Sequence, residues 1–389
     1  MTTTAILVKY GEIALRGGNR RIHEDILTSA IKKRLEDFKS ATVRKDQGRF
    51  YVEFDNKEDA RPIANIVSGI FGVTGVCICV KTGSNELEHL KTLALEHIRE
   101  RYPQGGSFKV IASRADKSYP LNSGELGAVI GAYLLENFPG LKVDLKNPEI
   151  RLHVELRSQV YIYSETLKGP GGLPSGSGGK AVLLLSGGFD SPVAGYMAAR
   201  RGVELICVYF HSPPYTSERA KEKAVDLAAR LSAYTGGLRL YAAPFTDLQL
   251  YLNDKAPEAK LTIFLKRAML KAAGLIAGKE NAQALITGDS VGQVASQTMH
   301  AIMAVDSAAT YPVLRPLCAM DKLDIINLAE KIGTHDISAR PYEDCCTIFV
   351  PKSPEIRPKR SIIETMEGRF ADLDGLIAAS VKAAEVIDL

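Results

Sequence analysis

The sequence predicts an α/β chain with a ferredoxin-like N-terminal domain, a second mixed α+β domain and a doubly wound parallel-sheet domain. The first 80 residues follow the order β-α-β-β-α-β, which is typical of the ferredoxin-like fold. A segment rich in Gly and Pro, 169–179, then interrupts the chain. Buried strands and helices alternate beyond it, which indicates a parallel sheet with right-handed crossovers. A length of 389 residues suits two or three domains.

The N-terminal pattern begins with an apolar strand at 5–10. Asn19 is the expected cap of a helix at 19–38, because apolar residues recur there at helical spacing. A hairpin at Gln47-Gly48 leads to a strand at 50–54. A short helix at 62–68 and a strand at 73–80 complete the pattern.

A second mixed unit is expected at 84–168. Its predicted elements are helices at 85–102 and 124–138 and strands at 108–112, 150–156 and 160–164. The loop 113–119 between strand and helix is polar and basic, so it suits contact with phosphates, although ordinary surface is the simpler interpretation of the loop taken alone.

The C-terminal pattern starts with a buried strand at 181–185. Further strands are predicted at 203–209, 238–243 and 284–287, with helices at 217–234 and 261–277 between them. In a parallel sheet the loops after the strands gather at one edge, where open α/β sheets bind their ligands. The loops 186–191, 211–215 and 288–297 are therefore expected to lie together.

The turn Ser186-Gly187-Gly188-Phe189-Asp190-Ser191 carries the strongest chemical signal. Its glycines let backbone N–H groups approach an anion, and Pro192 predicts that a helix N-terminus follows. No Lys follows the glycines, so the turn is not a kinase-type phosphate loop. A plain Gly-rich turn with a capping Asp or Ser stays open. The hexapeptide resembles the loop of ATP pyrophosphatases, which split ATP into AMP and pyrophosphate.

Composition excludes several classes. No apolar run reaches the length of a membrane span and no signal-peptide pattern opens the chain, so cytoplasmic localisation is expected. The six Cys form no CxxC motif, and no metal-ligating set is predicted. The net charge of +4 resides in residues 1–170, which hold 25 Lys/Arg and 21 Asp/Glu. That bias suits a polyanionic partner, and a solvated surface explains it equally well.

Several motifs together resemble the 4-thiouridine synthetase family, the tRNA uracil 4-sulfurtransferases. The match extends over essentially the whole chain. Its motifs are 9–17 (KYGEIALRG), 113–117 (SRADK), 147–150 (NPEI), 186–191 (SGGFDS), 211–215 (HSPPY), 287–298 (TGDSVGQVASQT), Arg315-Pro316-Leu317, Asp321-Lys322 and Cys345.

The resemblance implies a ferredoxin-like domain at 1–58, a THUMP RNA-binding domain at 59–168, a linker at 169–179 and a pyrophosphatase-loop catalytic domain at 180–389. It implies that the chain adenylates the C4 oxygen of uridine 8 in tRNA with ATP and Mg²⁺. A persulfide sulfur then displaces AMP and leaves 4-thiouridine. The first two domains are expected to bind tRNA through its shape and backbone.

Residue roles follow from the same resemblance. Lys322 is expected to act in adenylation, and Asp190 to position Mg²⁺ or the nucleotide. Arg16, Arg20, Arg114 and Lys117 are the expected tRNA contacts. The expected ATP-binding residues are Leu184, Leu185, Ser186, Gly187, Gly188, Asp190, Ser191, Tyr209, Phe210, Lys266, Gly288 and Gln297.

Cys345 is the expected sulfur carrier, because a persulfide needs an accessible thiolate and this Cys lies in a polar loop. Cys346 is the alternative. The chain ends at Leu389, so the rhodanese domain of some family members is expected to be absent. A cysteine desulfurase is then the expected sulfur donor, the family's link to thiamine thiazole synthesis is in doubt, and a homodimer is expected.

Two other functions stay open. One is a synthetase that uses the same loop to activate a small-molecule carbonyl, against which the absence of a glutaminase signature argues. The other is a non-catalytic THUMP protein with a degenerate loop, against which the intact turn and Gln297 argue.

Overall fold

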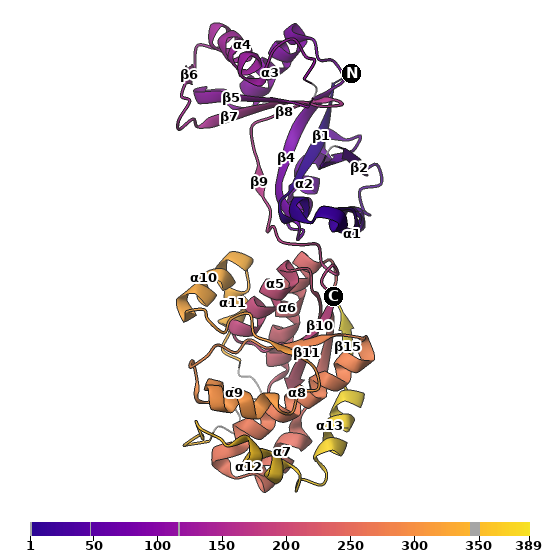
Figure 1. Cartoon of the computed structure of the whole chain (residues 1–389), viewed down its shortest axis with the longest axis vertical. Helices are drawn as coiled ribbons and strands as arrows, with labels where there is room; N and C mark the ends of the chain where they lie inside the picture. Colours follow the sequence, from indigo (N-terminus) through magenta and orange to yellow (C-terminus); the bar gives the residue numbers. More distant parts are fainter. Residues whose placement is uncertain (1, 47, 116, 343–350) are drawn as a thin grey trace. The chain divides into compact units, whose positions relative to one another are not determined.

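Residues 2–46, 48–115, 117–342 and 351–389 are described by the structure, which is a computed structural model. The chain divides into two units, Met1–Gly172 and Leu173–Leu389 (Figure 1). Among the described residues, no helix combines the length and the apolar character that a membrane crossing requires.

One continuous sheet organises the N-terminal unit. Its strands follow the order β2-β3-β1-β4-β8-β7-β5-β6, and β9 pairs with β4. They are β1 (Thr2–Tyr10), β2 (Thr42–Asp46), β3 (Arg49–Glu53), β4 (Val73–Thr82), β5 (Gly106–Arg114), β6 (Leu141–Val143), β7 (Ile150–Leu156), β8 (Val160–Tyr163) and β9 (Leu167–Lys168). The helices are α1 (Arg20–Arg34), α2 (Ala60–Ser68), α3 (Leu87–Arg101) and α4 (Ser123–Asn137).

The predicted ferredoxin-like order is confirmed, and β4 joins it to the second part of the unit. This strand pairs with β1 on one side and with β8 on the other, both antiparallel. On the β8 side, α3 and α4 pack Leu90, Ile98 and Ile130 against buried residues of β5 and β7. The domain boundary at residue 58 stays a prediction. The elements α2 and β4 follow it in the chain, and β4 pairs with β1 in the N-terminal sheet.

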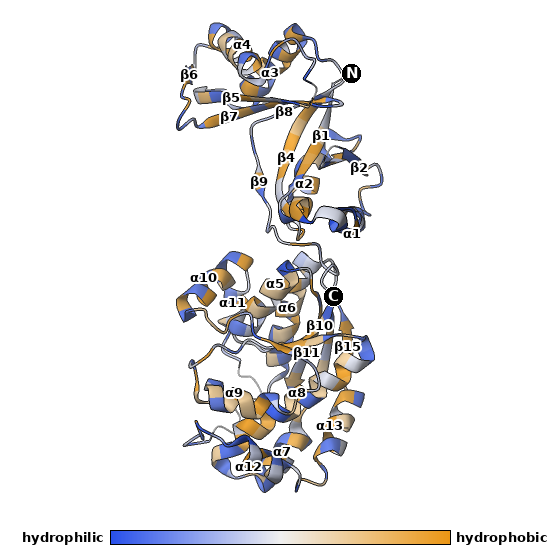
Figure 2. Cartoon of the chain, viewed as in Figure 1, coloured by the Kyte–Doolittle hydropathy of each residue, from blue (hydrophilic) through white to orange (hydrophobic). Residues whose placement is uncertain are grey.

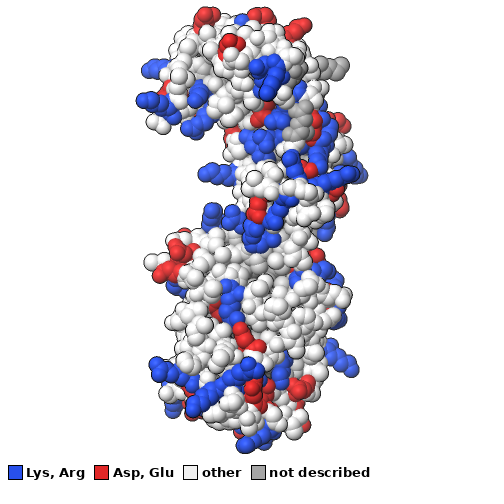
Figure 3. Space-filling view, viewed as in Figure 1, with Lys and Arg blue, Asp and Glu red and all other residues white. Residues whose placement is uncertain are grey.

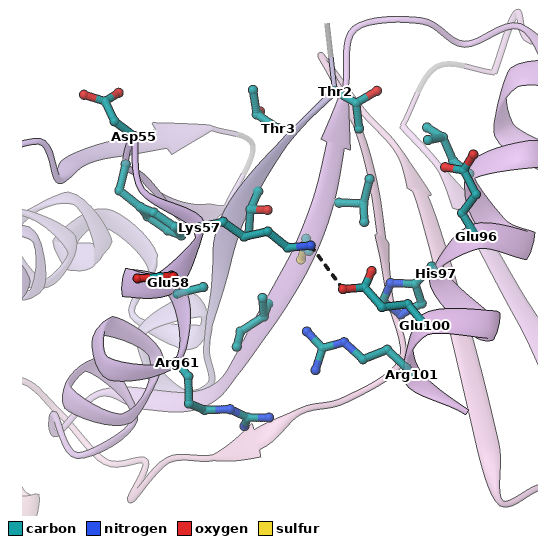
Figure 4. A pocket seen from close by; sticks show the side chains of 17 residues that line it. Thr2, Thr3, Asp55, Lys57, Glu58, Arg61, Glu96, His97, Glu100 and Arg101 are labelled. Carbon is teal, nitrogen blue, oxygen red and sulfur yellow. Dashed lines mark hydrogen bonds and ion pairs between the residues drawn. The ribbon is translucent and has the colours of Figure 1, made fainter. Parts of the chain in front are cut away.

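A cleft of about 700 Å³ opens in this unit between α2 and α3, above the first residues of β1 and the end of β4 (Figure 4). The Lys57 ammonium crosses it to the Glu100 carboxylate, with Nζ 3.1 Å from Oε1. Both side chains are largely exposed, so this ion pair contributes little to stability. No sequence motif predicted the cleft.

The C-terminal unit contains the predicted doubly wound sheet, in the order β14-β13-β10-β11-β12-β15. Neighbouring strands are parallel except β15, which lies antiparallel to β12. The strands are β10 (Lys180–Leu184), β11 (Glu204–His211), β12 (Arg239–Pro244), β13 (Ala284–Ile286), β14 (Val313–Leu314) and β15 (Glu385–Asp388). Its helices are α5 (Asp190–Arg200), α6 (Glu218–Thr235), α7 (Thr246–Lys255), α8 (Leu261–Glu280), α9 (Met299–Asp306), α10 (Lys322–Ile332), α11 (His335–Ser338), α12 (Arg360–Glu367) and α13 (Leu373–Lys382).

The core of this unit lies between the sheet and α8. Val182 and Val208 of the central strands pack with Phe264 and Ala268 of that helix, and all four are fully buried. Figure 2 colours much of β10 and β11 as hydrophobic, as expected for strands covered on both faces. Burying one such large side chain stabilises the fold by about 1.5–3 kcal/mol. This core holds the strand ends, and therefore the loops after them, in fixed positions.

The Gly- and Pro-rich segment forms backbone hydrogen bonds at Gly171 and Leu173. Gly171 O accepts from Gly72 N within the N-terminal unit, at 2.8 Å. Leu173 N donates to Arg200 O within the C-terminal unit, at 3.0 Å. The segment is therefore not a free coil along its length, and its expected limits at 169 and 179 stay a prediction.

Candidate active site

The predicted turn joins the end of β10 to the start of α5. The helix begins at Asp190, two residues before the expected start at Pro192. Proline is tolerated there because first-turn N–H groups have no partner within the helix. The turn therefore places a helix N-terminus, whose first N–H groups have no partner within the helix, at the carboxyl edge of the sheet.

Two serines hold the turn in shape. Ser191 Oγ accepts from Ser186 N at 2.8 Å and lies 3.1 Å from Ser186 Oγ. Gly188 N in turn donates to Ser186 Oγ at 3.4 Å. Gly288, after β13, passes so close that a Cβ there would lie 2.7 Å from Ser191 N, a backbone atom. Glycine is thus required at position 288 by the approach of two backbones.

A cavity of about 200 Å³ opens at this edge of the sheet. Every expected ATP-binding residue lines it except Gly187 and Gly188, which lie in the turn beside it. The lining residues predicted from the sequence are Leu184, Leu185, Ser186, Asp190, Ser191, Tyr209, Phe210, Lys266, Gly288 and Gln297. Those not predicted are Met269, Leu270, Thr287, Asp289, Val305 and Arg315. The structure thus brings the predicted residues together, and their binding of ATP stays a prediction.

Asp289 is the residue that orders one wall of the cavity. Its Oδ1 accepts from Lys266 Nζ at 2.9 Å and from Gln297 Nε2 at 3.1 Å. Its Oδ2 accepts from Thr287 Oγ1 at 2.8 Å, and Arg315 Nε lies 3.5 Å away. Burial alone would raise the pKa of this carboxyl, but the two cations and the hydroxyl outweigh burial and lower the pKa to about 2. Asp289 is therefore ionised and holds four side chains in place.

Asp190 and Lys322 form a second charged pair beside the turn. Lys322 Nζ lies 2.5 Å from Asp190 Oδ1, and Gln293 Nε2 donates to Oδ2 at 3.0 Å. Lys322 is the first residue of α10, whose cap is Asp321: its Oδ1 accepts from Leu323 N. The cap fixes the helix start and so directs the Lys322 backbone toward the turn. The pair places one cation next to the glycines, where a Walker-type loop would carry its own lysine.

The four expected tRNA contacts lie in the N-terminal unit. Arg16 pairs with Glu12 and Arg20 with Glu24, both one helical turn apart. Arg114 Nη1 donates to the carbonyl of Lys117 at 2.7 Å and so holds its own loop, while the Lys117 side chain is exposed. Apart from this bond between Arg114 and Lys117, no hydrogen bond or ion pair joins the four residues within the part of the chain that the structure describes.

The expected sulfur carriers, Cys345 and Cys346, lie outside the described residues. Among the described cysteines, Cys207 is buried in the sheet, and burial raises the pKa of its thiol. Cys318 is exposed. Asp289 and Arg315 were not predicted as site residues, although both lie within motifs that carried the family resemblance. The position of Asp289 just after a buried strand was the sequence signal that could have indicated its place in the site.

Comparisons with known proteins agree with this architecture. A model of the thiamine biosynthesis protein (ThiI) matches residues 176–371. Models of the ThiI ferredoxin-like domain and of the THUMP domain match residues 5–77 and 84–165. The predicted domain types are thereby confirmed.

Relatives match over the full chain. The probable tRNA sulfurtransferase of Lachnoclostridium phytofermentans is 46% identical over 385 residues, covering 98% of each chain. That of Thermoanaerobacter pseudethanolicus is 48% identical and covers 93% of this chain and 94% of its own. A crystal structure of a 4-thiouridine synthetase–RNA complex with bound ATP is 38% identical, with a TM-score of 0.91 and 99% of each chain covered.

These matches confirm the resemblance that the motifs indicated. They extend across both units and include the turn, the cavity and the N-terminal sheet. The chain therefore belongs to the ThiI family, together with proteins named probable tRNA sulfurtransferase.

Proposed function

We propose that this chain is an ATP-dependent tRNA sulfurtransferase that converts uridine 8 to 4-thiouridine. The observation that carries the proposal is the cavity at the carboxyl edge of the parallel sheet, bounded by the turn 186–191 and the two charged groups around Asp190 and Asp289. The structural relative with bound ATP and RNA supports both substrates. The THUMP match supports RNA as the partner of the N-terminal unit.

In the first step the C4 oxygen of uridine attacks the α-phosphorus of ATP, and the bond to pyrophosphate breaks. The turn's backbone N–H groups and the α5 N-terminus face the phosphates, and the Lys322 ammonium balances the charge that builds on the leaving group. A cavity of about 200 Å³ is smaller than the roughly 300–1,000 Å³ of typical ligand pockets. Part of the nucleotide therefore lies outside it, over Gly187 and Gly188.

The cavity interior suits a base. Leu184, Phe210 and Met269 supply apolar surface for adenine. Gln297 Oε1 is buried and accepts no hydrogen bond from any described residue, while its Nε2 is held by Asp289. A buried acceptor without a donor is costly, and an exocyclic amino group in the cavity would satisfy it.

The described residues of the site provide a single carboxylate beside the turn as a ligand for Mg²⁺. No cluster of three or more metal-binding side chains occurs among the described residues. Mg²⁺ commonly uses one or two carboxylates together with phosphate oxygens and water, and Asp190 supplies one carboxylate beside the turn. Both Asp190 oxygens accept bonds here, from Lys322 and Gln293. A bound Mg²⁺ would supply charge neutralisation on the phosphates, with Asp190 as the carboxylate that would hold it and Lys322 as a second source of positive charge.

Sulfur enters in the second step. We assign the persulfide to Cys345, whose terminal sulfur attacks C4 and displaces AMP, and a second thiol then cleaves the S–S bond and leaves a disulfide. A cysteine desulfurase is the proposed donor, and a homodimer is the proposed assembly. Arg16, Arg20, Arg114 and Lys117 are the proposed tRNA contacts of the N-terminal unit. A role in thiamine thiazole synthesis is a secondary proposal that the family model's name supports.

The test is a reconstituted reaction of ATP, Mg²⁺, unmodified tRNA, desulfurase and cysteine, followed by absorbance in the thiouridine band. Asp190→Ala and Cys345→Ser should each abolish the signal, and wild-type levels in both would reject the assigned residues. AMP release with a small-molecule carbonyl but not with tRNA would favour a synthetase of the alternative type.

A further inference from the structure

Three exposed cations lie near the start of α12, and we call Lys352, Arg357 and Lys359 the basic ridge. None of the three has an ion-pair partner among the described residues, whereas the neighbouring Arg360 pairs with Glu364 at 2.7 Å. In Figure 3, Lys and Arg side chains gather on this face of the C-terminal unit, in the region where Figure 1 draws α9 and α12.

The backbone of the ridge is anchored to the rest of the unit. Lys352 N donates to Glu258 Oε1 at 3.1 Å, and Glu355 N donates to Ala259 O at 2.8 Å. Lys260 pairs with the Glu355 carboxylate, which is the acidic side chain between Lys352 and Lys359. The segment is therefore held in place, and its own carboxylate is already neutralised.

A hydrogen bond links the backbone of the ridge segment to the residue that follows Gln297, a lining residue of the cavity. Thr298 Oγ1 donates to Ile356 O at 2.7 Å. Thr298 follows Gln297, which lines the cavity, and Ile356 precedes Arg357 of the ridge. The Met299 side chain, next along the chain, is 65% exposed. In the sequence, Gln297 of the proposed ATP site and Arg357 of the ridge are therefore each next to one partner of this hydrogen bond.

The cleft of the N-terminal unit provides a contrast. Its Lys57 pairs with Glu100, and Arg61 makes two bonds to Glu165, at 3.0 and 2.9 Å. Those cations are already compensated, so a polyanion gains little by displacing their partners. The cations of the ridge have no such partner among the described residues, and their binding to a phosphate backbone would release the counterions condensed on the nucleic acid.

We infer that the basic ridge binds the sugar–phosphate backbone of tRNA beside the uridine that reacts with the ATP held at the cavity. This inference rests on the proposed function, because it takes tRNA as the substrate of the same site. Charge complementarity selects a polyanion, and the link through Thr298 places the contacted phosphates next to the reacting base. The ridge would thereby position the target nucleotide, separately from the RNA contacts of the N-terminal unit.

The test is the triple variant Lys352→Ala/Arg357→Ala/Lys359→Ala in the full-length chain. Each cation removed from a phosphate should reduce the slope of log K against log salt by about 0.7–0.9, so the total reduction for three cations should be about 2.1–2.7. We expect tRNA affinity at moderate salt to fall by roughly 10-fold or more. ATP binding, followed by thermal stabilisation, should not change. Phosphate-ethylation interference should be compared between the wild type and the variant. The phosphates whose ethylation weakens binding of the wild type alone should be those that flank the thiolated uridine.

Controls separate this inference from the general charge of the protein. The double variant Lys331→Ala/Lys382→Ala removes exposed cations from the ends of α10 and α13 and should leave the slope unchanged. Arg357→Lys keeps the charge and should retain wild-type affinity. The inference is overturned if the triple variant keeps the wild-type salt slope and interference pattern while the wild type makes 4-thiouridine.

Two further outcomes are distinct. If the triple variant binds tRNA normally but no longer receives sulfur from the desulfurase, the partner of the ridge is a protein rather than RNA. This outcome would reject the inference. Ridge-dependent tRNA binding by a wild type that never forms 4-thiouridine would support the ridge and reject the proposed function.

Discussion

The Lys322 ammonium and the Asp190 carboxylate form an ion pair of 2.5 Å across 132 positions of the chain. This pair joins the start of α10 to the start of α5, the helix that follows the glycine turn. Its side chains are only partly exposed, 41% for Lys322 and 24% for Asp190. A cation that belongs neither to the turn nor to α5 is thereby placed beside the backbone that we propose binds the phosphates.

Removing Lys322 should slow adenylation and leave ATP binding comparatively intact. We expect Lys322→Ala to lower the single-turnover rate of AMP formation by roughly 100-fold, because the missing charge acts mainly on the leaving pyrophosphate. The double variant with Asp190→Asn should cost much less than the sum of the two single effects, because the residues act as a pair. Strict additivity would show that they act independently. Lys331→Ala, at the other end of α10, is the control.

Asp289→Asn should weaken ATP binding and change the response to acid. The folded pKa of about 2 lies below the ordinary value of 3.8, so the ionised carboxylate stabilises the fold above pH 4 and this contribution is lost as the pH falls toward 2. The contribution is roughly 2 kcal/mol at neutral pH. Urea unfolding at pH 6 and pH 3 should show a smaller difference in the variant than in the wild type. Equal differences would contradict the assignment.

His97 should make the N-terminal unit sensitive to mild acid. It is 5% exposed, its Nε2 lies 2.9 Å from Ser164 Oγ, and burial together with the charge of Arg101 lowers its pKa to about 4. The neutral ring is therefore favoured in the folded chain, and stability that is complete above pH 6.5 is lost as the pH falls through 4. The loss is up to about 3 kcal/mol.

The measurement for His97 is hydrogen exchange of the α3 amides between pH 6.5 and pH 4.5, corrected for intrinsic rates. His97→Gln should flatten the dependence of protection on pH. A variant that keeps the wild-type dependence would assign the effect to other groups.

Gly288→Ala should disturb the site through the backbone. The new Cβ would lie 2.7 Å from Ser191 N, and neither atom belongs to a flexible side chain. We expect a destabilisation of about 1–3 kcal/mol by urea unfolding and weaker ATP binding. Gly375→Ala, in α13 with no atom within 4 Å of the added Cβ, is the matched control and should stabilise by about 0.5–1 kcal/mol. Equal effects at the two positions would contradict the close approach.

The strands, the turn and much of the cavity lining were accessible from the sequence because their signals are local. An apolar run followed by paired glycines and Asp190 marks the end of a buried strand wherever it occurs. The role of Asp289 was not accessible in this way. Its partners Lys266 and Arg315 come from α8 and from the chain after β14, so only the tertiary fold brings them together.

Elements at the surface escaped prediction for a different reason. The strand β15 has no fully buried residue, so it lacks the apolar run that marked the other strands. It is held by pairing with β12 and by the contact of Arg239 with Asp388, with Nε 2.7 Å from Oδ1. Such a strand is specified by its neighbour rather than by its own composition.

The position of β15 has a consequence for synthesis on the ribosome. Its partner β12 is complete at Pro244, but Glu385–Asp388 emerge only some 140 residues later, and at about 5–20 residues per second that interval lasts roughly 7–28 s. During this time β12 is an open edge strand of the nascent chain, with unpaired N–H and C=O groups. Co-translational chaperone binding to this edge would protect it until β15 arrives.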